Sequence, residues 1–434
     1  MSNLICKNLD IKNNELYFGG RSTKEIAQKY KTPLYLMDEQ RIRENCKIYV
    51  DSLNKYFGNR AKALFASKAC SFKKMYEIVF SENMGADVVS VGEIYTAIKA
   101  GINPQELYFH SNSKTDDDIE YAISQNIGYF VVDNIEELDT INYFAGKKGI
   151  KQKALIRITP GIDTHTYEAV NTGKVDSKFG FPIETGAAEF VTGEALKREN
   201  VDLKGFHCHV GSQLFDSEVF IRSADIMLEF VGAMNKKFGF SAEILDLGGG
   251  YGVRYVDSDP EINIEEIIKE LASFYKKKCA QLNIKEPSVR LEPGRSIVAD
   301  AGLTLYTANT VKVIEGYKNY VAVDGGMCDN PRFALYKSAY SVVAASKAEE
   351  KCDFPCSLVG RCCESGDILQ ENIKLPSTIK RGDLIAVLTT GAYNYSMSSN
   401  YNRVSRLPIV MVNGESDYIA VKRETLDDIV RNDV

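Results

Sequence analysis

The sequence predicts an α/β fold: a (β/α)8 barrel of the TIM type followed by a mainly β domain. Between residues 33 and 300, short apolar or β-branched runs alternate with longer segments of helical period, a pattern typical of parallel α/β folds. Eight such runs fit into roughly 240 residues, as an eight-stranded barrel requires. After residue 300 the pattern changes to short alternating segments separated by turn residues, which indicates a β-sandwich or β-barrel.

The expected barrel strands and helices follow one another in order along the chain. Strands are expected at 61–67, 86–90, 107–110, 129–133, 154–159, 203–210, 243–248 and 288–292. Helices are expected at 91–100, 115–124, 134–144, 217–237 and 264–282. Several of these helices begin after Asp, Ser, Thr or Asn, which are the preferred N-cap residues.

In the second domain, strands are expected at 304–313, 320–323, 357–360, 384–388 and 405–412. Residues 16–18 are expected to add a strand to this domain, because the N-terminal segment has no helix partner of its own. The predicted domains are therefore a barrel at 35–300 and a β domain made of 1–34 and 301–434. We expect the two to pack firmly, since no linker rich in Pro, Ser or Gly separates them.

Composition and charge exclude several classes of function. The 434 residues carry 53 Lys and Arg against 59 Asp and Glu, and the basic residues are scattered, so nucleic acid and anionic membranes are not expected partners. No apolar stretch reaches about 18 residues, and the first residues do not form a signal peptide. Ten irregularly spaced cysteines are typical of reduced thiols in a cytoplasmic protein. The sequence thus predicts a cytoplasmic protein that binds a small molecule.

No metal site is predicted. The cluster Cys352, Cys356, Cys362 and Cys363 lacks paired C-x-x-C motifs and a nearby histidine. His207 and His209 lie two residues apart and share one face of a strand. Two such histidines can bind zinc, but the pattern offers no third ligand, and a histidine ring can equally stack on a flat cofactor.

The residues that end the predicted barrel strands suggest a reactive site. In a barrel of this kind the active site lies at the C-terminal ends of the strands. These ends carry Lys68, Asp87, His110, Asp133, Arg157, His207, His209, the glycine run 248–250, Glu292 and Arg295. Structural polar residues also occur at strand ends, but this combination favours chemistry.

Three of these features have a chemical interpretation and a structural alternative. Lys68 can be a Schiff-base nucleophile or a salt-bridge partner. The glycine run can bring bare backbone amides to a phosphate or can be a simple turn, and it lacks the spacing of a dinucleotide-binding motif. Glu292 can keep a heteroaromatic nitrogen protonated while Arg295 binds an anion, or the two can pair with each other.

Together these features describe a site for pyridoxal 5′-phosphate, and the sequence resembles the diaminopimelate decarboxylases. These are pyridoxal phosphate enzymes of the alanine racemase-like fold class and group IV decarboxylases. The resemblance runs in family order from about residue 33 to 423. Its motifs lie at 65–69, 85–93, 160–166, 176–180, 207–213, 248–250, 292–295, 363–367 and 391–393.

The resemblance implies a role for each matching residue. Lys68 would bind the cofactor covalently, His209 would stack on its ring, Glu292 would pair with its ring nitrogen, and Cys363 would return the proton; the implied catalytic residues are Lys68, Cys363 and His209. The implied cofactor-binding residues are Lys68, Asp87, His209, Ser212, Gly248, Gly249, Gly250, Glu292, Gly294, Arg295 and Tyr393. The implied substrate-binding residues are Arg295, Arg332, Tyr336, Glu364 and Tyr393.

In the family, the segment with Cys363 and Glu364 comes from the partner subunit, so the resemblance implies a homodimer with shared active sites. His165 and the stretch Asp176 to Gly180 match the family's motifs, but no chemical role is assigned to them. Phe333 and Cys328 depart from the common pattern, which affects the expected fine specificity.

The implied reaction is decarboxylation of meso-2,6-diaminopimelate to L-lysine and CO2, the last step of lysine biosynthesis. The charges of the matching residues favour this substrate, because its distal amino-acid group needs both a cation and an anion, here Arg295 or Arg332 with Glu364. Alternatives are another basic amino-acid decarboxylase of this fold, acting on ornithine, arginine or D- or L-lysine, or a catalytically silent pyridoxal phosphate-binding regulator. A racemase is less favoured, since the Cys363-Glu364 motif has no place in it.

Overall fold

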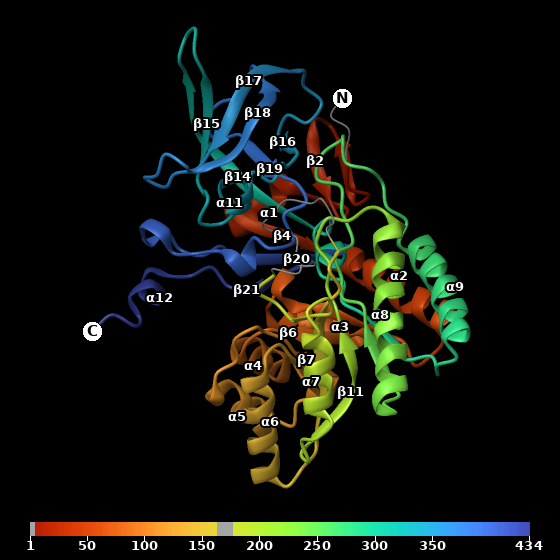
Figure 1. The fold of residues 1–434 in the computed structure, drawn as a ribbon. Coiled ribbons are helices and arrows are strands. Elements are labelled where there is room, and N and C mark those ends of the chain that lie inside the picture. Colours follow the sequence, from red (N-terminus) through yellow and green to blue (C-terminus); the bar gives the residue numbers. More distant parts are fainter. Residues whose placement is uncertain (1–4, 163–176) are drawn as a thin grey trace. The chain divides into compact units, whose positions relative to one another are not determined.

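The computed structural model describes residues 5–162 and 177–434, which fall into two compact units. Unit 1 comprises Met1–Asn45, Val253–Glu261 and Arg295–Val434. Unit 2 comprises Cys46–Gly252 and Ile262–Gly294. Unit 1 is mainly β, and unit 2 is the α/β barrel (Figure 1).

Unit 2 contains a closed barrel of eight parallel strands. Neighbouring strands pair in chain order, β13 pairs with β5, and the pairing of β8 with β9 completes the ring. All eight expected strands are confirmed. They are β5 (Lys62–Ala66), β6 (Gly85–Val88), β7 (Leu107–Phe109), β8 (Tyr129–Val132), β9 (Gln152–Thr159), β11 (Val201–His207), β12 (Ile244–Asp246) and β13 (Ser288–Leu291), and the short β10 (Phe181–Pro182) extends the sheet beside β9.

Helices alternate with these strands, as the sequence predicts, and consecutive helices pack side by side around the barrel (Figure 1). They are α3 (Lys73–Ser81), α4 (Val91–Lys99), α5 (Asp116–Ser124), α6 (Ile135–Lys148), α7 (Ala187–Ala195), α8 (Ser217–Phe238) and α9 (Ile264–Leu282); α2 (Glu39–Phe57) leads from unit 1 into unit 2. The expected caps form: Ser90, Asn134 and Asn263 each accept a backbone hydrogen bond from the third residue of their helix.

A small apolar cluster fills part of the barrel interior. It contains Leu64, Tyr108, Val131, Leu155 and Ile244, which come from five different strands. Such a layer makes the barrel a packed core rather than a channel. The polar residues at or just after the carboxyl ends of β5, β6, β7, β11 and β13 are therefore held at fixed places.

Unit 1 is built on a nine-stranded sheet whose central strand is β14 (Gly302–Val313). The sheet order is β18-β17-β15-β14-β4-β20-β21, and β19 pairs with both β14 and β16. The remaining strands are β4 (Leu34–Asp38), β15 (Asn319–Val323), β16 (Val342–Ala344), β17 (Cys352–Val359), β18 (Ile368–Pro376), β19 (Leu384–Val387), β20 (Ile409–Asn413) and β21 (Ser416–Val421). The expected strand at 405–412 begins only at Ile409, after Pro408, which has no amide proton to donate to a ladder.

The N-terminal segment forms a sheet of its own within unit 1. Strands β1 (Leu9–Lys12), β2 (Glu15–Phe18) and β3 (Arg21–Ser22) pair antiparallel with one another. The expected strand at 16–18 is confirmed as β2 within unit 1, but it pairs with β1 and β3 rather than with the nine-stranded sheet; Asn13 and Asn14 adopt φ of 52° and 62° and close a tight hairpin between β1 and β2. Leu16 and Phe18 nevertheless pack into the same apolar core as β4, β14 and β20.

The other helices of unit 1 are short. They are α1 (Thr23–Tyr30), α10 (Arg295–Val298), α11 (Arg332–Tyr336) and α12 (Leu426–Val430). Among the described residues, no helix combines the length and the apolar character that crossing a bilayer requires.

Candidate active site

Lys68 lies just after β5, in a short turn of 310 helix, and its ammonium forms an ion pair with Asp87 on β6. The Asp87 side chain is fully buried, whereas 41% of the Lys68 side chain is exposed. The neighbouring Ser67 hydroxyl lies 2.7 Å from both the Asp87 carbonyl and Oε2 of Glu93. Oε2 of Glu93 also accepts the Val89 amide at 2.8 Å, so this carboxyl group fixes the turn that carries Lys68.

Glu292, which follows β13, is buried between two histidines. Its Oε1 lies 2.8 Å from Nε2 of His110, and its Oε2 lies 3.2 Å from Nε2 of His207. Burial lowers the pKa of His207 to about 4 despite this carboxylate, so His207 is a neutral imidazole at pH 7. Burial raises the pKa of Glu292, but its interactions with His110 and His207 outweigh burial and hold the pKa well below its usual range.

A second buried carboxyl group lies near Glu292. Asp246 ends β12, is fully buried, and accepts the Gly248 amide at 2.9 Å through Oδ1. Burial, together with the negative charge of Glu292, raises the pKa of Asp246 well above its usual value. Of the two carboxyl groups, Asp246 is therefore the one that holds a proton more readily.

The glycine run shapes the loop after β12 and orients His209. The Gly249 amide donates to Nδ1 of His209 at 3.3 Å, and burial lowers the pKa of His209 well below its usual value, so the ring is neutral with a fixed orientation. A Cβ at Gly249 would lie 2.1 Å from the Glu292 carbonyl oxygen. A Cβ at Gly294 would lie 2.9 Å from that of Ala66, two residues before Lys68. Only glycine permits these close approaches.

The described part of the motif 176–180 packs against two of the strand-end residues. The Gly180 amide donates to Oδ1 of Asp133 at 2.7 Å, and the Phe179 ring lies 4.3 Å from the Arg157 guanidinium carbon. The stretch therefore holds Arg157, for which sequence analysis assigned no function. His165 and Asp176 lie outside the described residues.

Unit 1 contains the expected anion-binding residues. Arg295 and Arg332 are both buried, and the Tyr255 hydroxyl accepts a hydrogen bond from each. Tyr393 adopts a left-handed backbone conformation, with φ of 60°, and its ring lies 4.9 Å from the Arg295 guanidinium carbon. Tyr336 ends α11 and is partly exposed.

Cys363 and Glu364 are exposed on a turn of unit 1. Asp367 holds this turn by accepting the amides of Cys362 and Met327 at 2.7 and 2.6 Å, and Asn402 accepts the Cys363 amide at 2.7 Å. All ten cysteines are free thiols, and of the expected catalytic residues Cys363 is the one that faces outward. Both side chains are therefore accessible to solvent.

The structure joins several expected residues in one continuous set. Lys68 pairs with Asp87, Nε2 of His110 lies 3.8 Å from Asp87 and 2.8 Å from Glu292, and Glu292 contacts His207. The strand-end pattern identified His110, but its partnership with Glu292 could not be foreseen. Sequence analysis missed Glu93, Asp246 and Tyr255; Asp246 could have been found because it directly precedes the glycine run, whereas no pattern marks Tyr255.

The site also contains a set of groups that could bind a metal ion, which the sequence did not indicate. His110, His207 and Glu292 each offer one ligand atom, and these three atoms lie within 4.8 Å of one another. His209, the partner suggested for His207 by sequence spacing, does not belong to this set. The other two groups, His110 and Glu292, lie at the ends of strands far from His207 in sequence, so spacing alone could not find them.

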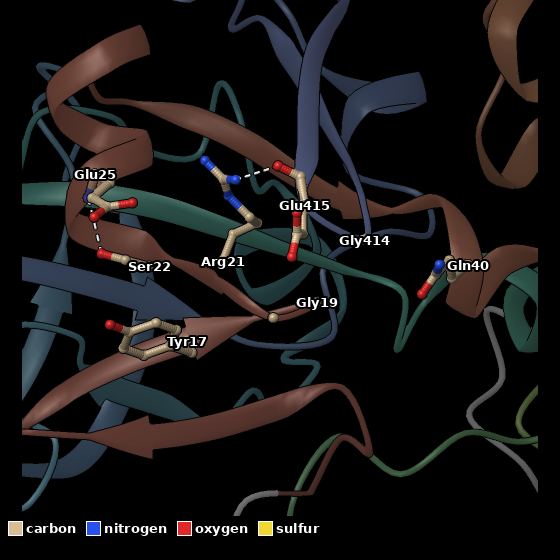
Figure 2. Close-up of a pocket in the computed structure, with 9 residues that line it drawn as sticks. Tyr17, Gly19, Arg21, Ser22, Glu25, Gln40, Gly414 and Glu415 are labelled. Atoms are coloured by element: carbon tan, nitrogen blue, oxygen red, sulfur yellow. Dashed lines mark hydrogen bonds between the residues drawn. The ribbon is translucent and has the colours of Figure 1, made fainter.

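A pocket of about 660 Å³ lies elsewhere in unit 1 (Figure 2). Its lining is mostly polar and already bonded internally: Arg21 pairs with Asp417, and Ser22 caps α1 by accepting the Glu25 amide at 3.1 Å. None of the expected site residues lines it. We therefore assign the chemistry to the residues at the barrel strand ends and not to this pocket.

The chain is similar to known proteins over nearly its whole length. A family model described as pyridoxal-dependent decarboxylase, pyridoxal binding domain, matches residues 39–299. The diaminopimelate decarboxylase of Staphylococcus aureus (strain COL) is 41% identical over 421 residues, which cover 97% of this chain and 98% of that enzyme. The diaminopimelate decarboxylase of Bacillus subtilis (strain 168) is 40% identical over 419 residues, which cover 96% and 95%.

A solved structure extends the similarity to three dimensions. The diaminopimelate decarboxylase of M. jannaschii, in a complex with L-lysine, matches with a TM-score of 0.91 at 31% identity. The match covers 99% of this chain and 98% of that one, so it includes the β domain as well as the barrel.

Proposed function

Because the chain belongs to the pyridoxal-dependent decarboxylases, and within them to the diaminopimelate decarboxylases, we propose that it converts meso-2,6-diaminopimelate to L-lysine and CO2. The observation that carries the proposal is the buried set that joins Lys68, through Asp87 and His110, to Glu292. It places an accessible amine and an ionised, buried carboxylate at the ends of neighbouring strands. A buried carboxylate with a strongly shifted pKa beside an accessible amine is typical of a functional site.

The residues of unit 2 fit pyridoxal 5′-phosphate. Among the described residues, Oε1 of Glu292 makes no well-aligned hydrogen bond, although Nε2 of His110 lies close to it. A protonated ring nitrogen would satisfy this buried oxygen. When bound, the cofactor supplies an electron sink for the electron pair left as CO2 departs.

The residues of this site then have distinct roles. Lys68 holds the cofactor covalently, with Asp87 beside it. Glu292 would accept a hydrogen bond from the ring nitrogen, and the neutral His209 would offer a flat face for stacking. Gly294 provides the close approach beside Lys68.

Ser212, Gly250, Arg295 and Tyr393 would bind the phosphate. The amides of Gly248 and Gly249 already donate within the chain, to Asp246 and His209, so these two glycines contribute mainly by shaping the loop.

Substrate recognition follows from charge. The distal group of diaminopimelate carries one carboxylate and one ammonium, and Arg332 and Glu364 supply the opposite charges. Tyr336 and Tyr393 complete these contacts. Cys363 returns a proton to the carbon that loses CO2.

We propose a homodimer in which Cys363 and Glu364 act in the partner's active site. Their exposure supports this, because a proton donor and a substrate-binding carboxylate need a protected environment that their own turn does not give them. In such an isologous dimer each chain completes the site of the other.

A parallel assay tests the proposed reaction. The protein, supplied with pyridoxal phosphate, is given meso-diaminopimelate, ornithine, arginine, D-lysine or L-lysine, and released CO2 is measured. We expect rapid release from diaminopimelate alone, unchanged by a metal chelator. Faster release from ornithine or arginine would assign another basic amino-acid decarboxylase, no release from any substrate would favour the silent regulator, and loss of activity with chelator would assign a metal to His110, His207 and Glu292.

A further inference from the structure

The hydroxyl oxygen of Tyr255 lies between two buried guanidinium groups. Nη1 of Arg295 donates to it at 2.8 Å, and Nη1 of Arg332 donates to it at 3.3 Å. All three side chains are almost completely buried within unit 1. Since both donors reach one oxygen, the two Nη1 atoms are at most about 6 Å apart.

Two like charges so close together repel each other strongly in a buried environment. Burial raises the pKa of the Tyr255 phenol, but the charges of Arg295 and Arg332 outweigh burial and hold it below its usual value. The phenol oxygen thus carries extra negative character and offsets part of the repulsion. Among the described residues, Arg332 has no carboxylate within ion-pair distance, so Tyr255 and Tyr340 are its charge-offsetting neighbours.

Aromatic rings and one amide complete the arrangement. The Arg332 guanidinium carbon lies 5.4 Å from the centre of the Tyr255 ring and 5.9 Å from that of Tyr340. Tyr340 also accepts a hydrogen bond from Arg332 at 2.9 Å and one from Asn394 at 3.3 Å. Asn394 in turn donates to the Thr390 carbonyl at 3.0 Å and so fixes the loop that carries Tyr393.

We propose that Tyr255 is a positioning residue that holds Arg295 and Arg332 as one pair of cations at a set spacing, ready to receive two anionic groups. Their identity rests on the proposed function: the two groups are the cofactor phosphate and the distal carboxylate of the substrate. Each anion then meets a guanidinium group that is already held in place, so binding requires less ordering of the arginine side chains. Tyr255 thereby couples cofactor affinity to recognition of a substrate with two carboxylates.

Tyr255→Phe tests this role, because it keeps the ring and removes only the shared acceptor. We expect the Kd for pyridoxal phosphate, measured by absorbance titration of the full chain, to rise about tenfold, and the KM for diaminopimelate to rise similarly, since one hydrogen bond to a charged group has about this value. The kcat should change less than about threefold, because the contacts affect substrate and transition state alike. The thermal midpoint should change little.

Two matched variants separate positioning from packing. Tyr251→Phe removes the hydroxyl of another buried tyrosine that, among the described residues, has no hydrogen-bond partner, and it should leave all four measurements unchanged. Tyr340→Phe removes an acceptor from Arg332 and from Asn394 but none from Arg295, so it should raise KM more than it raises the Kd for the cofactor. If Tyr255→Phe fails to fold, the comparison of KM with the cofactor Kd in Tyr340→Phe still tests whether phenol hydroxyls hold Arg332.

A substrate-independent measurement separates failure of this inference from failure of the proposed function. Inorganic phosphate should raise the unfolding midpoint of the wild type more than that of Tyr255→Phe, whatever substrate the enzyme uses. The inference would be overturned if Tyr255→Phe showed the cofactor affinity, the KM and the phosphate response of the wild type. It would also be overturned if Tyr251→Phe showed losses as large as those of Tyr255→Phe. Absence of CO2 release from diaminopimelate by the wild type, with the phosphate difference intact, would overturn only the proposed function.

Discussion

Lys68 and Asp87 form an ion pair whose two ends differ in access: the carboxylate is fully buried and the ammonium is partly exposed. Asp87 thus holds the amine at a fixed place while its nitrogen stays within reach of a ligand. We predict that borohydride reduction after incubation with pyridoxal phosphate labels Lys68, with one adduct per chain found by peptide mapping. Lys68→Ala should show neither the adduct nor CO2 release.

Lys73→Ala is the control for this experiment. Lys73 begins α3 a few residues away and is exposed, so its loss should leave labelling unchanged. An adduct found on a lysine other than Lys68 would remove the basis of the site assignment.

The exposed turn with Cys363 predicts that inactive variants complement each other. Lys68→Ala and Cys363→Ala, mixed one to one and allowed to exchange subunits, should recover up to about a quarter of wild-type sites, because half of the dimers are mixed and each has one intact site. Activity is measured after subunit exchange has been verified by native mass spectrometry. Exchange without recovered activity would mean that each chain uses its own Cys363.

The barrel could be predicted because its signal is local. Each strand is a short apolar run, each helix has a capping residue, and the residue after each strand lies at the active face whatever the other strands do. Lys68, His110 and Glu292 were therefore found from their positions alone. The N-terminal hairpin was missed because two asparagines with positive φ decide its pairing, and asparagine reaches that conformation only in some contexts.

The contacts between these residues could not be predicted, because they depend on barrel closure. His110 and Glu292 are 182 positions apart, yet their side chains lie 2.8 Å from each other. Tyr255 lies in a loop with no periodic pattern, and its position between two arginines arises only when segments of unit 1 far apart in sequence come together. Sequence spacing indicates which strand ends meet, but not which atoms do.

The carboxyl pair of Asp246 and Glu292 predicts a pH-dependent stability difference. The Asp246 pKa is about 3.9 in the unfolded chain and well above that in the fold, so folding takes up a proton between these values. The stability of the wild type therefore falls as pH rises through this window. Asp246→Asn mimics the protonated acid and lacks this loss, so relative to the wild type it should become more stable from pH 5 to pH 8.

Urea unfolding of both proteins at the two pH values measures this effect. Asp246→Asn should cost less than about 1 kcal/mol at pH 5, because the amide oxygen can still accept the Gly248 amide. A stability difference that does not change with pH would mean that Asp246 is ionised in the folded protein.

Substrate specificity gives the last prediction, through Arg332. If this buried guanidinium binds the distal carboxylate, Arg332→Leu leaves that carboxylate without its partner, and loss of a charge-assisted bond should cost about 2 to 5 kcal/mol in kcat/KM for diaminopimelate. D-lysine has no distal carboxylate, so its slow reaction should change little, or improve as a positive charge near its ammonium is removed. The decisive quantity is the ratio of the two kcat/KM values, because damage to the fold or to cofactor binding lowers both equally. Equal losses on the two substrates would therefore assign Arg332 to the fold or the cofactor, and the charge argument for diaminopimelate would fail.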